Sequence, residues 1–193
     1  MPEKPSSTAR LEAFSDGVLA VIITIMVLEL KVPHANGIAG LRAILPILLI
    51  YLLSFAFTGI YWINHQHLIE RIQAADAAIL YANLVFLLCL SLLPFFTSYL
   101  IEKNTEPFAV ALYVLSMIAT GFSFLLLRLA VHRHLRHTGR LARADDAERR
   151  KHLLSLALYL IAVPIAYVHP PVALLLVAVV TLVWILPTLA LRR

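Results

Sequence analysis

The chain has 193 residues, of which 61% are hydrophobic and 14% are charged, and its formal net charge is +5. A soluble domain carries about 25% charged residues, so this composition excludes an ordinary soluble protein and predicts an integral membrane protein. The single cysteine, Cys89, excludes an intrachain disulfide.

The first apolar segment covers residues 14–33. Its uncharged part, 17–28, is too short by itself for a bilayer core that takes about 20 helical residues. The full segment is long enough, but it places Asp16 and Glu29 near the two membrane boundaries. Acidic groups on a spanning helix are costly against lipid and usually face a bundle interior or water. We therefore expect this helix to be central to a membrane assembly.

One face of this helix is apolar along its length. At 3.6 residues per turn, the face carries Phe14, Gly17, Val18, Val21, Thr24, Ile25 and Leu28. Most apolar stripes are packing seams between helices. The alternative is a pore lining with one hydroxyl, that of Thr24, among apolar constrictions. The residues alone leave both interpretations open.

Five further apolar segments follow, each apolar nearly all round, as membrane helices are. The predicted spans of this single domain, 1–193, are 14–33, 41–63, 77–101, 108–131, 153–168 and 172–191. Pro94 predicts a kink in the third span. Arg128, at the end of the fourth span, is expected to extend its charge toward the lipid headgroups. Residues 132–152 are predicted to form a basic loop, part of which has the i,i+4 charge spacing of a helix.

The distribution of basic residues predicts the orientation. Six spans place both termini on one side, and thirteen of the sixteen Lys and Arg residues fall on that side. By the positive-inside rule, both termini and residues 132–152 are cytoplasmic in a multi-pass protein of the cell membrane. The basic loop is expected to contact anionic lipid headgroups. Nucleic acid is not an expected partner, because the charge follows the topology.

A polar cluster is predicted at the cytoplasmic ends of the first three spans. Polar groups at this depth need partners, because water is scarce. We expect Ser15 and Asp16 to accept hydrogen bonds from the neighbouring helices and so to lock the helices together. The residues that share this depth are Arg10, Ser15, Asp16, Trp62, Asn64, His65, His67 and Asn83.

Two motifs carry a family resemblance. Arg10-x-x-x-Phe14-Ser15-Asp16 opens the first span, ahead of an apolar run that ends at Leu28-Glu29, and Tyr61-Trp62-Ile63-Asn64-His65 closes the second. These motifs resemble the transmembrane protein 175 family, which comprises potassium channels of endosomes and lysosomes and their bacterial relatives. The whole chain resembles one bacterial subunit, whereas the longer animal members carry two such units. The resemblance implies a homotetramer in which the first helix lines the pore.

The resemblance also implies roles for individual residues. Val21, Ile25 and Leu28 would form a hydrophobic constriction, with Val21 at the position where the narrowest isoleucine or leucine usually sits. Thr24 matches a threonine associated with potassium preference, and Glu29 would lie at the pore mouth. The cluster that includes Phe14 would hold the pore helices in register. The chain contains no Thr-Val-Gly-Tyr-Gly sequence, so a carbonyl cage of that type cannot supply selectivity.

Two other function classes stay open. A small proton- or ion-coupled transporter could use Asp16 or Glu29, although carriers place their sites near the membrane midplane. A non-conducting scaffold is the third alternative. An enzyme is not expected, because no nucleophile–base arrangement or phosphate-binding loop is present. The histidines at 65–67 and 132–137 lack a cysteine or carboxylate to complete a tetrahedral set, so we expect no metal site and no cofactor, with potassium only as the permeant ion.

Overall fold

The computed structural model describes residues 7–138 and 144–190, and it describes side chains at 8–138 and 148–185. All the elements in this part of the chain are α-helices, which confirms the all-α prediction. The helices are α1 (Ser7–Val27), α2 (Gly37–Ile69), α3 (Ala77–Ser91), α4 (Leu93–Glu102), α5 (Pro107–His137), α6 (Ala144–Val168) and α7 (Pro170–Ala190).

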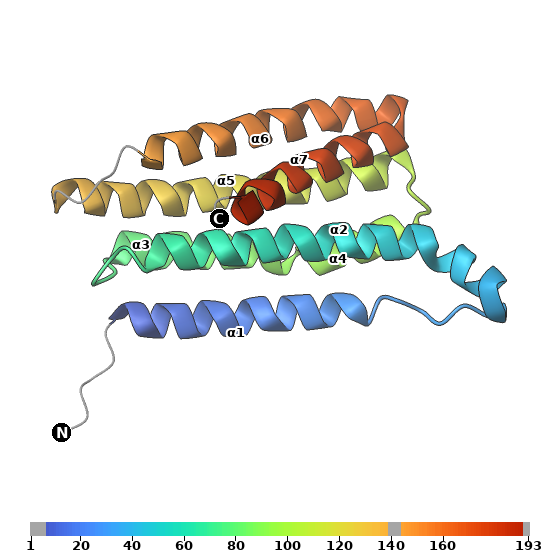
Figure 1. The fold of residues 1–193 in the computed structure, drawn as a ribbon, viewed down its shortest axis with the longest axis horizontal. Coiled ribbons are helices and arrows are strands. Elements are labelled where there is room, and N and C mark those ends of the chain that lie inside the picture. Colours follow the sequence, from blue (N-terminus) through green and yellow to red (C-terminus); the bar gives the residue numbers. More distant parts are fainter. Residues whose placement is uncertain (1–6, 139–143, 191–193) are drawn as a thin grey trace, which may run out of the picture.

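The helices form an up-and-down bundle along one long axis (Figure 1). The α1–α2, α4–α5 and α6–α7 connections lie at one end of the bundle, and the α2–α3 connection lies at the other. α5 occupies the centre and packs against α3, α4, α6 and α7. α1 lies at the edge of the bundle, where it contacts α2, α3 and α4. The face of α1 that turns away from these three helices is left to other partners.

Among the described residues, four helical stretches are long and apolar enough to cross a membrane: Gly37–Ile69, Ala77–Glu102, Pro107–His137 and Glu148–Val168. A shorter apolar stretch, Pro170–Ile185, follows them. α1 carries Arg10, Glu12 and Asp16 in its first turns, so its uncharged part is short. Large apolar side chains such as Leu88 and Leu160 are exposed on the outside, as lipid contact requires. These features agree with a multi-pass membrane protein, and the number of six crossings stays a prediction.

α1 covers Ser7–Val27, so it begins and ends before the predicted bounds 14–33. Hydropathy marks only the part of a helix that suits lipid, whereas backbone hydrogen bonding continues into polar residues with good helix propensity. After Val27 one 3₁₀-type turn follows, in which Leu28 N donates to Ile25 O at 3.0 Å. Pro33 disfavours helical backbone at Val32, so the helix could not have continued through the predicted end at residue 33.

Helical structure also replaces much of two predicted connections. α2 continues to Ile69, so His65 lies within a helix and not in a connection over 65–76. The predicted loop 132–152 is largely helical, because α5 and α6 extend into it from both sides. Residues 139–143 lie outside the described part. The physical reason is the same as at α1: charged and polar residues end an apolar run without ending the helix.

Two prolines shape the bundle. α3 ends at Ser91 and α4 begins at Leu93, with Pro94 in the first turn of α4. Proline lacks an N–H and clashes with the preceding turn, so it interrupts the helix here and confirms the predicted kink. Pro46 lies inside α2, and prolines inside helices are a common cause of kinks. Figure 1 shows a bend near the N-terminal end of α2.

Arg128 does not extend toward lipid headgroups, contrary to the prediction. Its side chain is buried, and its Nη1 donates to Oε2 of Glu148 at 2.9 Å. The guanidinium carbon lies 5.5 Å from the ring centroid of Phe124. The reason is the central place of α5: most of its surface faces other helices, so a charge on it must find a partner inside the subunit.

Candidate ion pathway along the first helix

The apolar face of α1 that the 3.6-residue period predicts is exposed on the outside of the subunit. The side chain of Val21 is 55% exposed, that of Ile25 is 45% exposed and that of Leu28 is 76% exposed. Phe14 and Thr24 are exposed as well. The opposite side of α1 is buried in the subunit and consists of Leu11, Ser15, Leu19, Ile22 and Met26. The subunit therefore uses one face of α1 for its own core and leaves the other, apolar face uncovered.

A groove runs beside this face, between α1 and the α3–α4 segment, and its volume is about 770 Å³. Most of its lining is apolar, and polar side chains enter it from Glu29, Ser91 and Ser98. The apolar lining residues are Ala13, Phe14, Gly17, Val18, Val21, Ile22, Ile25, Pro94 and Phe95. Two of the predicted constriction residues thus line a groove with one charged side chain near its end.

Thr24 is exposed on the outer face of α1, and its Oγ1 donates to the backbone oxygen of Val21 at 2.9 Å. This bond uses the hydroxyl proton and leaves the lone pairs of the oxygen directed away from the helix. The Thr24 hydroxyl can therefore act as an acceptor toward a cation or a water molecule, which suits the role that the family resemblance implies.

Three buried polar side chains form a chain of hydrogen bonds between helices. Nδ2 of Asn83 donates to Oγ of Ser15 at 3.0 Å, and Ser15 Oγ donates to the backbone oxygen of Leu11 at 2.8 Å. Oδ1 of Asn83 lies 2.8 Å from Nε2 of His65. Because the amide nitrogen of Asn83 donates to Ser15, the amide oxygen of Asn83 must be the acceptor in the second bond, and the His65 ring is the donor. This network joins α1, α2 and α3.

Asp16 reaches a different neighbour. Its Oδ1 accepts a hydrogen bond of 2.9 Å from Nε1 of Trp62 on α2. Both side chains are exposed in the single subunit, so Asp16 is not the buried acceptor that the sequence suggested. Ser15 and Asp16 are adjacent on α1, but their hydrogen bonds reach different helices, α3 for Ser15 and α2 for Asp16.

Two signature residues lie apart from this network. Arg10 is exposed, and with Phe14 it lines a groove that Asn83 also lines. Asn64 donates from Nδ2 to the backbone oxygen of Ile60 at 2.7 Å, within its own helix. With about 100° between successive helical residues, Asn64 lies about 200° round α2 from Trp62 and cannot share its partner.

Comparison with known proteins finds relatives along nearly the whole chain. Residues 10–94 match the family model described as endosomal/lysosomal potassium channel TMEM175. A potassium channel from Chryseobacterium sp. (strain P1-3) is 38% identical over 92% of this chain and 92% of its own length. The chain belongs to the TMEM175 family. This result confirms the family that the two motifs predicted.

Two further proteins support the TMEM175 assignment. A potassium channel from Streptomyces collinus is 34% identical, over 88% of this chain and 87% of its own length. The crystal structure of a lysosomal potassium-selective channel TMEM175 homolog from Chamaesiphon minutus matches with a TM-score of 0.78 and 27% identity. That match covers 93% of this chain and 97% of the other. Membership of the TMEM175 family places the chain among ion channels and not among enzymes.

The part of the chain that matches the TMEM175 model contains α1 from Arg10 onward, α2 and α3. It therefore includes the outer face of α1 and the hydrogen-bond network of Ser15, Asn83 and His65. Ser98, which lines the groove from α4, lies beyond it. Sequence reasoning missed Ser91 and Ser98, because serine is common in apolar helices and nothing in the sequence indicates which helix α4 faces.

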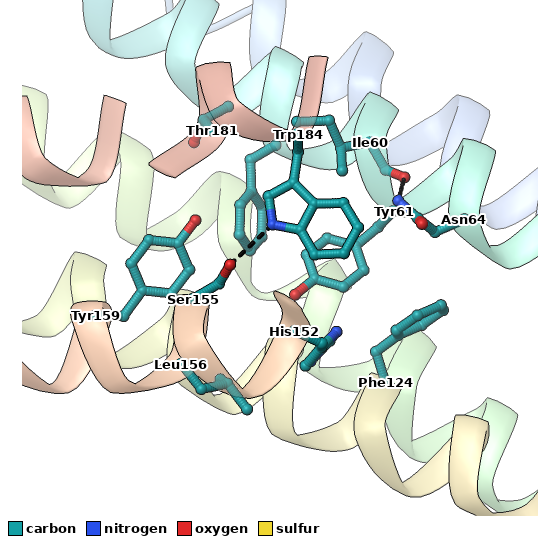
Figure 2. Close-up of a pocket in the computed structure, with 11 residues that line it drawn as sticks. Ile60, Tyr61, Asn64, Phe124, His152, Ser155, Leu156, Tyr159, Thr181 and Trp184 are labelled. Atoms are coloured by element: carbon teal, nitrogen blue, oxygen red, sulfur yellow. Dashed lines mark hydrogen bonds between the residues drawn. The ribbon is translucent and has the colours of Figure 1, made fainter. Parts of the chain in front are cut away.

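A second cavity lies inside the TMEM175 subunit, among α2, α5, α6 and α7 (Figure 2). Its volume is about 20 Å³, which is room for about one water molecule. Asn64 lines it together with His152, whose Nε2 donates to the backbone oxygen of Gly121 at 2.8 Å. Trp184 Nε1 donates to Oγ of Ser155 at 2.9 Å across the same cavity. No residue of α1 lines this cavity, so it is separate from the α1 groove.

Proposed function

We propose that four copies of this chain form a potassium-permeable cation channel in which α1 of each copy lines the pore. The observation that carries the proposal is the uncovered apolar face of α1, with Val21, Ile25 and Leu28 along it. Lipid is a poor cover for this helix, because Asp16 and Glu29 flank the apolar run. Copies arranged around a closed symmetry axis would cover the face, and the TMEM175 resemblance supports four of them.

The rings of Val21, Ile25 and Leu28 would act as the barrier. An ion must shed hydration water to enter a narrow apolar neck, and the neck offers no replacement ligands. Water itself withdraws from such a neck, so conduction stops when the rings approach one another. Valine is smaller than the isoleucine or leucine usual at the first position, so Ile25 and Leu28 carry more of the closure in this chain.

Potassium is the proposed permeant ion, because the bacterial relatives in the comparison are potassium channels by name. The Thr24 hydroxyls would form the polar ring between the apolar ones, with oxygen lone pairs available to the ion. The network of Ser15, Asn83 and His65 would hold α1 at a fixed rotation, so that the same residues face the axis in every copy.

The orientation and the lipid contacts belong to the same proposal. Six crossings with both ends in the cytoplasm place the junction of α5 and α6 at the cytoplasmic face, and its arginines suit anionic headgroups. Exposed Arg133, Arg136 and Arg150 flank that junction in the described part of the chain. Localisation in the cell membrane follows from this arrangement.

The main alternative is a coupled carrier that uses Asp16 or Glu29. In the structure Asp16 lies near the middle of α1 and Glu29 lies just past its end. The two carboxylates contact different helices, since Asp16 accepts from Trp62 and Glu29 accepts from Ser98. A carrier site would bring its polar groups together near the membrane midplane. A non-conducting scaffold is the third possibility, and it makes no use of the α1 face as a pathway.

Flux from potassium-loaded liposomes containing the purified protein tests these functions. We expect passive potassium efflux without a proton gradient, whereas a carrier would require stoichiometric exchange and a scaffold would give no flux.

Substitutions in the proposed lining test the pathway itself. Val21→Asn or Ile25→Asn should let water into the apolar neck and raise the resting potassium efflux. Met26→Asn is the matched control, because Met26 is buried on the opposite side of α1 and its replacement should reduce folded protein instead. Unchanged potassium efflux in both asparagine variants would contradict the proposal that this face of α1 lines the pore.

A further inference from the structure

Glu29 and Ser98 make a hydrogen bond between two helices at one end of the α1 groove. Ser98 Oγ on α4 donates to Oε2 of Glu29 at 2.7 Å. A hydroxyl–carboxylate bond of this length is charge-assisted and stronger than a bond between neutral groups. Both residues line the groove, and both are partly buried. The bond therefore fixes the position of a negative charge beside the apolar face of α1.

Glu29 needs such a fixed partner because of where it lies. It follows the end of α1 at Val27 and belongs to the 3₁₀-type turn, in which Glu29 N donates to Met26 O at 3.3 Å. The end of a helix carries partial negative charge on its unpaired carbonyl groups, which repels a carboxylate. A hydroxyl donor from the neighbouring helix offsets this repulsion and selects one direction for the side chain.

From these contacts we propose that Ser98 is a positioning residue that holds the Glu29 carboxylate toward the groove, where this carboxylate concentrates hydrated cations at one mouth of the pathway. The inference rests on the proposed function and adds a partner residue from α4 to it. The helix-end carbonyls of α1 add to the same negative field. Lys31, the next charged residue along the chain, is exposed and carries the opposing charge.

A fixed charge of this kind acts over the Debye length, which is about 30 Å at 0.01 M salt and about 3 Å at 1 M. Its effect on a nearby charged molecule is therefore large in dilute salt and small in concentrated salt. Positively and negatively charged reagents should report it with opposite sign. A reaction rate that depends on salt and on the sign of the reagent indicates a fixed charge beside the groove. A bond that only stabilises the contact between α1 and α4 would produce neither dependence.

The test measures the field without requiring conduction. The test substitution is Leu28→Cys in a Cys89→Ala background, because the Leu28 side chain is 76% exposed and Leu28 precedes Glu29. Two methanethiosulfonate reagents of similar size are used, one with a trimethylammonium group and one with a sulfonate group. The measured quantity is the ratio of their reaction rates with the full-length protein in liposomes, at 0.01 M and at 1 M KCl.

We expect the ratio to favour the cationic reagent roughly tenfold in dilute salt and to approach its free-thiol value at 1 M. Glu29→Gln and Ser98→Ala should both remove the preference, and Ser98→Thr, which keeps the hydroxyl, should restore it. Ser91→Ala is the matched control, because Ser91 lines the same groove but donates to the backbone oxygen of Leu88. The control should keep the preference.

Each other outcome decides against part of the inference. A ratio that does not change with salt in the unsubstituted background, or that survives Glu29→Gln, overturns the role of Glu29, and this result needs no folded Ser98 variant. A preference lost in Glu29→Gln but kept in Ser98→Ala overturns the role of Ser98. Absence of potassium efflux from the unsubstituted protein would instead overturn the proposed function, and the rate ratio would still report the field.

Discussion

Ser15 accepts a hydrogen bond from Asn83 at a position where neither side chain is reached by solvent, and this bond attaches α1 to α3. Asn83→Ala would leave Ser15 with one partner fewer and His65 without its acceptor. An unsatisfied buried group costs about 1–3 kcal/mol. We expect the thermal midpoint of the detergent-solubilised subunit to fall by several degrees, as measured by scanning fluorimetry.

Asp16→Ala provides the comparison within the same motif. Asp16 and its donor Trp62 are exposed in the single subunit, so their loss should change the thermal midpoint of the subunit little. It should reduce the recovery of assembled channel in mild detergent, as judged by light scattering after size exclusion. Identical behaviour of the Asn83 and Asp16 variants in both measurements would contradict this division between folding and assembly.

Thr24 should set the preference between potassium and sodium. Thr24→Ala removes the exposed hydroxyl oxygen and leaves the surrounding apolar rings in place. We expect permeation to persist while the ratio of potassium to sodium permeability, obtained from reversal potentials, moves toward one. Thr24→Ser keeps the oxygen and should retain most of the preference. Loss of the preference in the serine variant would show that the methyl group, and not the hydroxyl, matters.

Gly17 offers a test of what faces α1. A Cβ at Gly17 meets no atom within 4 Å in one subunit, and the same holds at Gly59 on α2. Alanine is favoured over glycine inside a helix by about 1 kcal/mol, so neither substitution should harm the isolated subunit. If copies of α1 surround an axis, Gly17→Ala narrows the pathway and lowers efflux from liposomes, whereas Gly59→Ala does not. Equal efflux from both variants would place the Gly17 side away from the pathway.

The Arg128–Glu148 pair should contribute to the stability of the α5–α6 contact. Removing one partner of a fully buried pair costs about 3–5 kcal/mol, because a charge is left without compensation. The Glu148 side chain is 60% exposed, so water replaces part of the interaction, and we expect a loss of about 2 kcal/mol for Glu148→Ala. Glu70→Ala is the control, since Glu70 is exposed and accepts from Gln66 on the neighbouring turn. Equal thermal midpoints would show that the pair is energetically neutral.

Topology can be tested by labelling cysteines with a membrane-impermeant reagent in the Cys89→Ala background. Lys103 lies in the α4–α5 connection, and Thr138 follows the last residue of α5, so the two positions lie at opposite ends of that helix. We expect Lys103→Cys to react from outside intact cells and Thr138→Cys to react only after permeabilisation. The reverse pattern would invert the proposed orientation.

Periodicity predicted the local geometry of α1 well. Positions 21 and 25 lie on one exposed face because a helix repeats every 3.6 residues whatever surrounds it. Leu28, in the 3₁₀-type turn after α1, is exposed as well. The partners of Ser15 and Asp16 were predictable for a related reason, since polar groups at one membrane depth must satisfy one another. Asn64 was the exception within the motif, because neighbours in sequence point in different directions on a helix.

The order of helices in the bundle was not predictable from hydropathy. Arg128 looked like a residue that reaches for headgroups, because a terminal arginine on a lipid-facing helix does so. It is paired inside the subunit because α5 is central. The sequence did contain a signal, since Ser116, Thr120, Gly121 and Ser123 are small residues that allow helices to approach closely. A Cβ at Gly121 would lie 2.7 Å from Cδ2 of Leu156, which shows how close that approach is.

The enclosure of α5 determines how the subunit comes apart. In its most apolar stretch 67% of the residues are buried, compared with 22% in α2 and in the α6 stretch. Its amide hydrogens should exchange with solvent only when the whole bundle opens, whereas those of α1, at the edge, can exchange through detachment of a single helix. The helix proposed to line the pathway packs against α2, α3 and α4 at the edge of the bundle, so a gating motion of α1 would leave the packing of α5 against its neighbours as an intact frame.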